Sequence, residues 1–339
     1  MKDKRYVIID TDPGDDDAAS ILWVLANSSI DVLGITVTYG NVGLEYCVIN
    51  ALRTTEVAQR TNIPVFKGAF KPLVRPAIEA SWIHGRDGFG DCGFSMPKGR
   101  ATEGYAPVEM IRLAREAEKP VTILALAPLT NIALALLLDK DFSSYVQQIV
   151  FMGGAVRVSG NRTPRASYNV VADPEAAKIV YNSGIPIVQV GLDVCDFVTQ
   201  EVSDLDSIAK ASTPVTDFLV RLMEFRREKA IHTVKDSYGN IVKIIKASEQ
   251  GGGRGSGIGL NDLTATGYLI NPEWFDTKLM AGDIETMGLC VGETVLDSSG
   301  LWGKVPNVHF AYAVESRALV NQWVADMKNF PGSENSSKS

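Results

Sequence analysis

The chain has 339 residues, with 33 lysines and arginines against 40 aspartates and glutamates, so its formal net charge is −7. Apolar residues make up 45% and charged residues 22% of it, which is typical of a globular protein and excludes a mostly disordered one. The acidic balance argues against a protein that binds nucleic acid or a membrane surface, because such binding needs a basic footprint.

Short apolar runs alternate with helical patterns through the first part of the chain. Apolar runs predict buried strands at residues 6–9, 32–38, 63–66, 121–126, 148–152 and 185–190. Helical spacing of apolar residues predicts helices at 18–25, 44–52, 106–117, 129–138 and 174–183. Because the strands are apolar on both faces, this order predicts an α/β fold with a mostly parallel central sheet flanked by helices, similar to an open Rossmann-type sheet. We expect a single domain over residues 1–331 and a disordered tail over 332–339.

Cysteine usage and the apolar segments indicate a cytoplasmic protein. The four cysteines are scattered without a Cys-x-x-Cys pair, which favours reduced thiols. No apolar stretch near the first residue is long enough for a signal peptide. The uncharged run 121–138 contains Pro128 and Asn131, so it favours a strand, a turn and a helix over a membrane span. Residues 250–259 contain six glycines, and we expect a mobile loop or a lid there.

A dense acidic turn follows the first predicted strand. Its sequence is Asp10-Thr11-Asp12-Pro13-Gly14-Asp15-Asp16-Asp17. Like charges this close repel one another, and a hard divalent cation removes the repulsion by binding carboxylate, carbonyl and water oxygens. A solvated acidic turn is the alternative. An EF-hand loop starting at Asp10 does not fit, because it would need glycine at Asp15 and glutamate at Ile21.

The complete pattern Asp-x-Asp-Pro-Gly-x-Asp-Asp resembles the signature of the nucleoside hydrolases, the inosine-uridine-preferring N-ribohydrolase family. Further segments follow in the order of that family across roughly residues 5–270. They are Tyr39-Gly40-Asn41, residues 83–88, 128–131 and 152–155, Gly160-Asn161, Asn169, residues 173–177 and Asp262. Haloacid-dehalogenase-type phosphotransferases also resemble the chain in Asp10 and Asp12, but they have threonine or valine where it has Gly14.

The resemblance implies a role for each matching residue. Asp12, Asp17 and Asp262 would bind Ca²⁺ together with the backbone carbonyl of Leu126. Asp12 would also be the catalytic general base for a metal-bound water. The substrate would be contacted by Asp16, which would accept from the ribose 2′-hydroxyl, and by Asn41, His84, Met152, Asn161, Ser167 and Asn169. Asp10 would orient its neighbours without touching the substrate.

Two positions depart from the family pattern. Many members have histidine where this chain has Asn261, and that histidine protonates the departing base, which an asparagine does not do. His232, Tyr238 and Arg254 are therefore candidates for leaving-group contacts. Many members also have glutamate, which contacts the sugar, where this chain has Ser167.

The function implied by the resemblance is Ca²⁺-dependent hydrolysis of the N-glycosidic bond of ribonucleosides to free base and ribose, as in purine and pyrimidine salvage. The partner would be a small-molecule ribonucleoside, with no nucleic acid or membrane, and the protein would form a homodimer or homotetramer. One alternative is a relative that binds a ribonucleoside or an ADP-ribose-like ligand with weak or no turnover. A haloacid-dehalogenase-type phosphotransferase is the other. The base preference stays open.

Overall fold

The computed structural model describes residues 4–229, 231–235, 241–246 and 258–332. Ten strands form one sheet. In spatial order they are β13 (Thr294–Asp297), β12 (Phe275–Ile284), β14 (Val308–Val314), β7 (Ile187–Val190), β6 (Val146–Met152), β5 (Val121–Ala125), β1 (Arg5–Thr11), β2 (Ile30–Val37), β3 (Val65–Lys67) and β4 (Thr102–Tyr105). Neighbouring strands from β14 to β4 are parallel, whereas β12 is antiparallel to both β13 and β14. The prediction of a mostly parallel sheet is confirmed.

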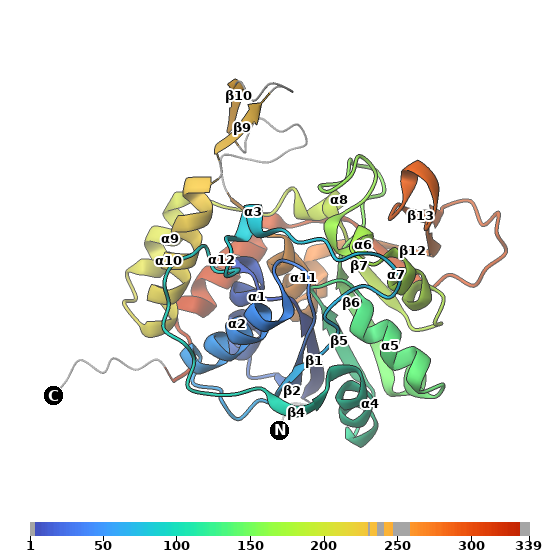
Figure 1. The fold of residues 1–339 in the computed structure, drawn as a ribbon, viewed down its shortest axis with the longest axis horizontal. Coiled ribbons are helices and arrows are strands. Elements are labelled where there is room, and N and C mark those ends of the chain that lie inside the picture. The colour runs from blue at the N-terminus through green and yellow to red at the C-terminus, as the bar shows by residue number, and fades with distance from the viewer. Residues whose placement is uncertain (1–3, 230, 236–240, 247–257, 333–339) are drawn as a thin grey trace.

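Helices cover both faces of this sheet (Figure 1). The longer ones are α1 (Asp15–Ala26), α2 (Leu44–Val57), α4 (Ala106–Glu116), α5 (Thr130–Leu138), α7 (Pro174–Tyr181), α9 (Val202–Ala209), α10 (Pro214–Lys229), α11 (Asn261–Ile270) and α12 (Ser316–Lys328). Val7 and Ile9 of β1 pack in the core on the side of α1, while Ile8 packs on the side of α4 and α5. Successive residues of a strand point to opposite faces, so both faces of β1 are apolar and both are covered.

Each strand and helix predicted in the first part of the chain is present, with shifts at the ends. The helix predicted at 18–25 begins earlier, at Asp15, because three aspartates lie in its first turn and favour the positive end of the helix dipole. The prediction did not include β4 or the short helices α3 (Ser81–His84), α6 (Tyr168–Val171) and α8 (Leu192–Cys195). It also made no statement about β12, β14 or α12 in the C-terminal part.

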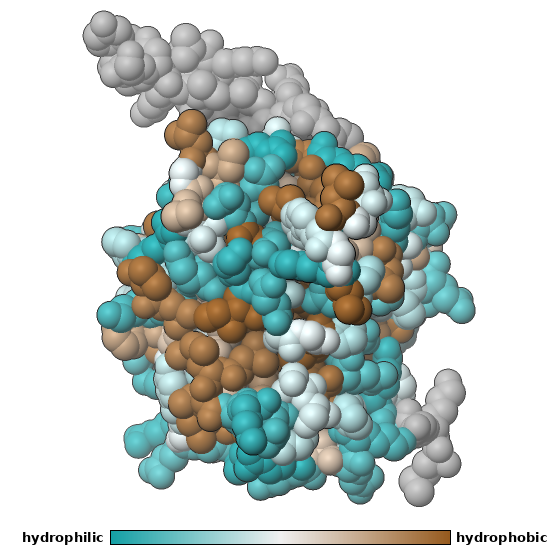
Figure 2. All heavy atoms as spheres, turned by 90° about the vertical axis from the view of Figure 1, so that its right-hand side faces the viewer, coloured by the Kyte–Doolittle hydropathy of each residue, from teal (hydrophilic) through white to brown (hydrophobic). Residues whose placement is uncertain are grey.

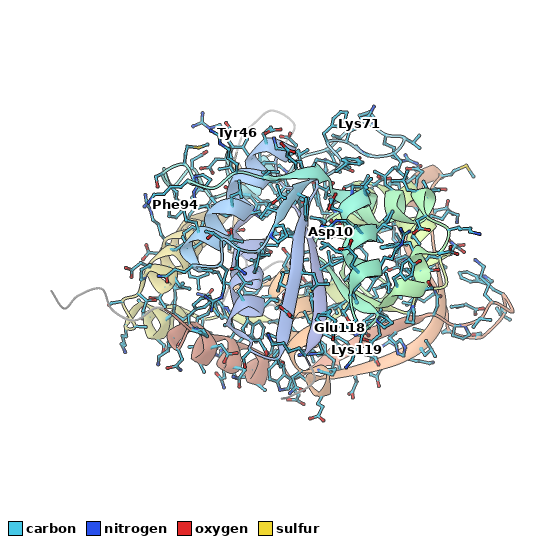
Figure 3. All side chains as sticks on the ribbon, turned by 90° about the horizontal axis from the view of Figure 1, so that it is seen from below. Asp10, Tyr46, Lys71, Phe94, Glu118 and Lys119 are labelled. Carbon is cyan, nitrogen blue, oxygen red and sulfur yellow. The ribbon has the colours of Figure 1, made fainter. Side chains whose placement is uncertain are left out.

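The pairing of β1 places the acidic turn at one edge of the sheet. In register, Asp10 of β1 lies opposite Thr36 of β2 and Ala125 of β5. The carboxyl ends of parallel strands meet at the same edge, so the loops that follow β1, β2 and β5 are neighbours. Figure 3 shows Asp10 inside the molecule beside the central strands, whereas Glu118 and Lys119 lie toward the far end of the sheet.

Smaller elements and the surface complete the fold. Two short antiparallel pairs are β8 (Thr199–Gln200) with β11 (Ile258–Gly259), and β9 (Ile231–Lys235) with β10 (Ile241–Lys246). All four cysteines are free, as predicted. Within the described residues, none of the helices is long and apolar enough to cross a membrane.

Apolar side chains gather on the side of the molecule that carries β12 and β13 (Figure 2), where Leu289 and Leu301 are exposed.

Candidate active site

The acidic turn between β1 and α1 is buried. Asp10, Asp12, Asp15, Asp16 and Asp17 are each at most 4% exposed, although all five are carboxylic acids. Burial without compensation disfavours a charged carboxylate, and neighbouring like charges disfavour it further. The turn therefore depends on the hydrogen-bond donors that the surrounding loops supply, and on any positive charge that it can bind.

Asp12 is held by the loop that follows β2. Its Oδ2 accepts a hydrogen bond from the backbone N–H of Asn41 at 2.7 Å. Gly40 makes this approach possible, because a Cβ at that position would lie 1.8 Å from Asp12 Oδ2. The other oxygen, Oδ1, is buried and accepts no hydrogen bond from the described part of the chain. A buried carboxylate oxygen without a donor is costly, so Oδ1 is suited to a cation or to the hydrogen of a bound molecule.

The Asp17 carboxylate, unlike that of Asp12, accepts hydrogen bonds at both of its oxygens. Thr11 Oγ1 donates to its Oδ1 at 2.5 Å, and the backbone N–H of Gly14 donates to its Oδ2 at 2.9 Å. The side-chain amide of Asn41 also donates to Asp17 Oδ2 at 3.0 Å and to the backbone oxygen of Asp12 at 3.1 Å. Because Nδ2 of Asn41 uses both hydrogens here, only its Oδ1 remains for a substrate.

Asp262 joins this turn from the other end of the chain. It lies in the first turn of α11, and one of its carboxylate oxygens lies within 4.8 Å of an oxygen of Asp16 and of Asp17. A set of oxygen ligands is what a hard divalent cation prefers. Two of the three carboxylates predicted to bind Ca²⁺, Asp17 and Asp262, are in this group. It contains Asp16, predicted to bind ribose, in place of Asp12.

The carboxylates raise one another's pKa values. Burial raises the pKa of Asp262 well above its usual range, and the charges of Asp17 and the other acidic residues of the turn raise it further. Burial and the charge of Asp17 also raise the pKa of Asp12. The pKa of Asp17 rises through burial and through the charge of Asp16. A bound divalent cation would reverse these shifts, because its positive charge favours the ionised carboxylates.

Asn169 of α6 holds the loops after β5 and β6. Its side-chain amide donates to the backbone oxygen of Leu126 at 2.8 Å and to that of Met152 at 2.9 Å. Leu126, whose carbonyl was predicted to bind Ca²⁺, is therefore at the same edge of the sheet as the acidic turn. Both hydrogens of Asn169 Nδ2 are used, so its Oδ1 is the atom left to accept from a hydroxyl group.

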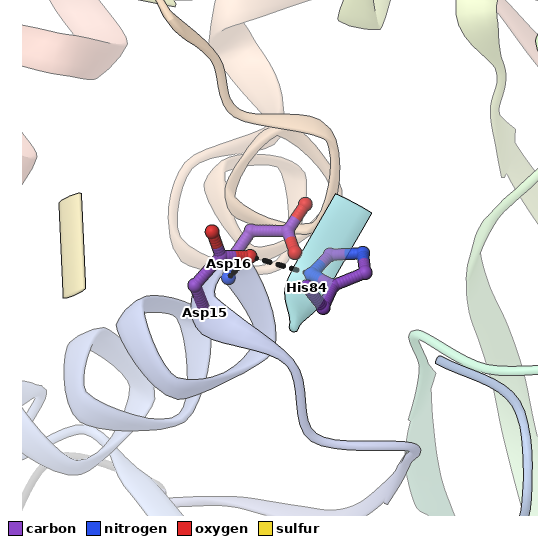
Figure 4. A group of neighbouring side chains, drawn as sticks. All are labelled: Asp15, Asp16 and His84. Carbon is purple, nitrogen blue, oxygen red and sulfur yellow. Dashed lines mark hydrogen bonds and ion pairs between the residues drawn. The ribbon is translucent and has the colours of Figure 1, made fainter. Parts of the chain in front are cut away.

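His84 packs against the start of α1 (Figure 4). Its Nδ1 lies 2.7 Å from Asp15 Oδ1, which also accepts from the backbone N–H of Asp16 at 3.0 Å. The imidazole is 6% exposed, and Gly14 makes room for it, because a Cβ there would lie 2.7 Å from His84 Nδ1. His84 was predicted on the ligand side of the site. Its contact with Asp15, to which the sequence assigned no role, was not predicted.

Asn161 and Ser167 lie on the segment before α6. The side-chain oxygen of Asn161 accepts from the backbone N–H of Tyr168 at 2.8 Å, and the residue is exposed. Ser167 is buried, and its Oγ accepts from the backbone N–H of Gly154 at 2.7 Å. Ser167 still has its own hydroxyl hydrogen to donate. These contacts hold the segment against the loop after β6, beside Met152.

Asp10 lies in β1, just before the acidic turn, and is held by side chains of β2 and α5. Thr36 Oγ1 donates to its Oδ1 at 2.7 Å, and Asn131 Nδ2 donates to the same oxygen at 2.8 Å. Burial outweighs these bonds and raises the pKa of Asp10 to about 7. Asn131 had been noted only as part of a motif. Its position at the start of α5, next to the carboxyl end of β5, was the available sign that it would reach this site.

Only two of the four leaving-group candidates, Asn261 and His232, lie among the described residues. Asn261 begins α11 next to Asp262, and its backbone oxygen accepts from Cys195 Sγ at 3.7 Å. His232 is on β9, and Tyr238 and Arg254 lie outside the described residues. The glycine-rich segment that was predicted to be mobile also lies outside them, apart from its last two residues on β11.

One residue near the site was missed entirely. The hydroxyl of Tyr168 lies 2.7 Å from the backbone oxygen of Gly40 and 2.8 Å from that of Ile78. The sequence offered only a weak sign of this contact, namely that Tyr168 stands between Ser167 and Asn169, which were both predicted to be in the site.

An open, mostly parallel sheet with buried carboxylates gathered beyond its central strands defines an α/β enzyme whose acidic centre is suited to a divalent cation. A family model described as inosine-uridine preferring nucleoside hydrolase matches residues 7–321. The chain therefore belongs to this family, as the resemblance of its motifs implied, and it is a nucleoside hydrolase.

Individual relatives match over nearly the whole chain. A probable uridine nucleosidase 2 of Arabidopsis thaliana is 34% identical over 327 residues, which cover 94% of this chain and 96% of that protein. RihA of Escherichia coli O1:K1, a pyrimidine-specific ribonucleoside hydrolase, is 36% identical over 316 residues, which cover 93% and 96%. A solved purine-preferring ribonucleoside hydrolase from Gardnerella vaginalis matches with a TM-score of 0.86 and 26% identity, over 96% of this chain and 99% of that one.

Proposed function

We propose that this protein hydrolyses the N-glycosidic bond of ribonucleosides, releasing the free base and ribose, with Ca²⁺ bound at the acidic turn. The observation that carries the proposal is the cluster of Asp16, Asp17 and Asp262, whose oxygens lie within 4.8 Å of one another in the same acidic site as the buried Asp12. The names of the relatives, a uridine nucleosidase and ribonucleoside hydrolases, support a ribonucleoside as the substrate.

The donor set fits Ca²⁺. Asp12, Asp17 and Asp262 would hold the ion with the carbonyl of Leu126, and all four offer oxygen, the ligand atom that Ca²⁺ takes. Asp12 Oδ1, which has no donor among the described residues, is the atom best suited to this contact. When bound, the ion would orient a water molecule and lower its pKa modestly.

Asp12 would act as the general base. While its Oδ2 stays bound to the N–H of Asn41, the carboxylate accepts a proton from the attacking water. A new C–O bond forms at the anomeric carbon, the C–N bond breaks, and its electron pair leaves with the base. Positive charge develops on the ribose during this step, and the carboxylates of Asp12 and Asp16 stabilise it.

The ribose hydroxyls would bind to polar side chains of the acidic turn, of the loop after β2 and of α6. Asp16 would accept from the 2′-hydroxyl. Asn41 and Asn169 each use both side-chain N–H hydrogens within the protein, so each would accept through Oδ1. Asn161, Ser167 and Met152 would line the other end of the sugar, and His84 would lie toward the leaving base.

The leaving base requires a proton or a hydrogen bond that Asn261 is poorly suited to give. His232, Tyr238 and Arg254 remain our candidates for that contact. A single alanine variant of each, assayed with one purine and one pyrimidine nucleoside, would show a reduced kcat for the group that protonates the base. If a variant retains the wild-type kcat with both nucleosides, the residue it replaces does not protonate the leaving base.

The test is the release of reducing sugar from a panel of ribonucleosides by the purified protein, with Ca²⁺ and with a chelator. We expect sugar release that the chelator abolishes and that Ca²⁺ restores. Ligand binding measured by calorimetry without any sugar release would instead favour the alternative of a binding protein with weak or no turnover. Because the chain belongs to the nucleoside hydrolase family, we no longer consider the alternative of a haloacid-dehalogenase-type phosphotransferase.

We also propose a cytoplasmic location, a role in purine and pyrimidine salvage, and a homodimer or homotetramer. Sedimentation of the purified protein tests the oligomeric state. The exposed apolar residues near β12 and β13, such as Leu289 and Leu301, are the first surface to examine for a subunit contact.

A further inference from the structure

Three consecutive side chains at the start of α6 reach three different loops at the carboxyl edge of the sheet. Ser167 contacts Gly154, after β6, and Asn169 contacts Leu126, after β5. Tyr168, between them, places its hydroxyl 2.7 Å from the backbone oxygen of Gly40, in the loop after β2. This short segment therefore connects loops that carry separate parts of the proposed active site.

The contact of Tyr168 leads directly to Asp12 through one peptide group. The carbonyl of Gly40 accepts from the Tyr168 hydroxyl. The N–H of Asn41 belongs to the same peptide group, and it donates to Asp12 Oδ2 at 2.7 Å. Hydrogen bonds at the two ends of one amide polarise it and strengthen each other. The backbone of Gly40 also lies close to Asp12, because a Cβ built on it would lie only 1.8 Å from Asp12 Oδ2.

We propose that Tyr168 is a positioning residue, whose hydroxyl fixes the Gly40–Asn41 peptide and, through it, the orientation of the Asp12 carboxylate. A phenol has one hydrogen, so it donates to one carbonyl at a time. The backbone oxygen of Ile78 is the second acceptor within reach, at 2.8 Å. We assign the hydrogen to the Gly40 carbonyl, which is the nearer of the two acceptors.

The expected fall in kcat rests on the proposed function, in which Asp12 is the base. The expected loosening of the Gly40–Asn41 peptide group does not depend on that function. Without the hydroxyl, the Gly40 carbonyl loses its donor, and the N–H of Asn41 is held less firmly. The Asp12 carboxylate can then rotate away from the direction needed for proton transfer. The side-chain amide of Asn41 keeps its own hydrogen bonds to Asp12 and Asp17, so its ribose contact changes little. We therefore expect kcat to fall while KM stays close to the wild-type value.

The experiment compares Tyr168→Phe with Tyr181→Phe. Both changes remove one hydroxyl and keep the ring. Tyr181 is 2% exposed, lies on α7 and donates to Gln189 Oε1 at 2.8 Å, away from the acidic turn. Three quantities are measured on each full-length variant: amide hydrogen exchange of residues 39–42, affinity for Ca²⁺ by calorimetry, and kcat and KM with uridine and inosine.

For Tyr168→Phe we expect exchange at the Asn41 amide to be about 5-fold faster, kcat to fall about 5- to 30-fold and KM to change less than about 2-fold, as the loss of one partly buried hydrogen bond implies. Ca²⁺ affinity should also fall about 3-fold, because one predicted ligand is less well oriented. Tyr181→Phe should leave all three measurements at the wild-type level, whatever it does to thermal stability.

Two results would overturn the proposal. One is exchange at residues 39–42 that is the same in Tyr168→Phe as in the wild type. The other is a kcat equal to that of the wild type, which would show that the hydroxyl does not orient Asp12. If the wild type releases no sugar from any nucleoside, the proposed function fails, and the exchange measurement still decides the role of Tyr168.

Discussion

The imidazole of His84 and the carboxylate of Asp15 form a buried pair, with His84 Nδ1 2.7 Å from Asp15 Oδ1. Asp15 occupies the variable position of the Asp-x-Asp-Pro-Gly-x-Asp-Asp pattern, so this contact depends on the residue that this chain has there. The same oxygen accepts from the backbone N–H of Asp16. Asp15 therefore links the orientation of His84 to the first turn of α1.

Replacing Asp15 with asparagine tests this link. Asp15→Asn keeps the shape of the side chain and removes the charge from a hydrogen bond to the imidazole. We expect kcat/KM for ribonucleosides to fall about 10- to 100-fold, as for the loss of a charge-assisted hydrogen bond. If the two residues act as a unit, the double variant Asp15→Asn/His84→Asn should be no worse than His84→Asn alone. Fully additive losses would contradict the coupling. The control is Asp31→Asn, at a side chain that is 47% exposed.

Asp12→Asn should reduce the rate of sugar release by several orders of magnitude, because an amide cannot accept the proton of the attacking water. The change preserves shape, so the far-ultraviolet circular dichroism and the cooperative thermal transition should remain. Activity within about 10-fold of the wild type, in a variant that is still folded, would exclude Asp12 as the general base.

In the absence of a bound cation, the free energy of unfolding should fall as the pH rises. The folded-state pKa of Asp10 is about 7, against an ordinary value of 3.8, and the pKa values of Asp12 and Asp262 are raised in the same direction. Between roughly pH 4 and 7 the folded state thus holds more protons than the unfolded state, so raising the pH favours unfolding. For Asp10 the shift corresponds to a loss on the order of 4 kcal/mol.

Urea unfolding at pH 5 and pH 7.5 measures this effect. In the presence of a chelator, the free energy of unfolding should be lower at pH 7.5. Added Ca²⁺ should raise it at pH 7.5, because a ligand that binds the folded state stabilises it. If the chelated protein is more stable at pH 7.5 than at pH 5, the inference that burial raises the pKa values of these carboxylates is wrong.

Gly40→Ala should abolish most of the activity. The new Cβ would lie 1.8 Å from Asp12 Oδ2, so either the carboxylate or the loop after β2 must move. We expect kcat to fall at least about 100-fold, since small misplacements of a catalytic group are costly. Gly99→Ala is the matched control, because its Cβ would meet only Leu52 Cδ2 at 3.8 Å. If Gly40→Ala and Gly99→Ala had equal activity, the close packing around Asp12 would not matter for the reaction.

Local sequence patterns were sufficient for the central part of the fold. Apolar runs such as the one around Ile8 are long enough and apolar enough to be buried strands, and their alternation with helices requires parallel pairing. The C-terminal strands were not predicted. β12 has exposed residues such as Leu279 beside buried ones, so its pattern does not distinguish an outer strand from a loop.

The sequence by itself determined the class of enzyme and the residues of the acidic turn, because Asp12, Asp16 and Asp17 are neighbours in the chain and local spacing is enough to recognise them. The resemblance of the motifs also grouped Asp262 with them, and the packing of α11 against α1 brings Asp262 to Asp17. Only the tertiary structure decided the contacts that no motif records. Tyr168 reaches the Gly40 carbonyl, and His84 pairs with Asp15. Contacts of this kind depend on the packing of whole elements, which leaves no periodic signal near either residue.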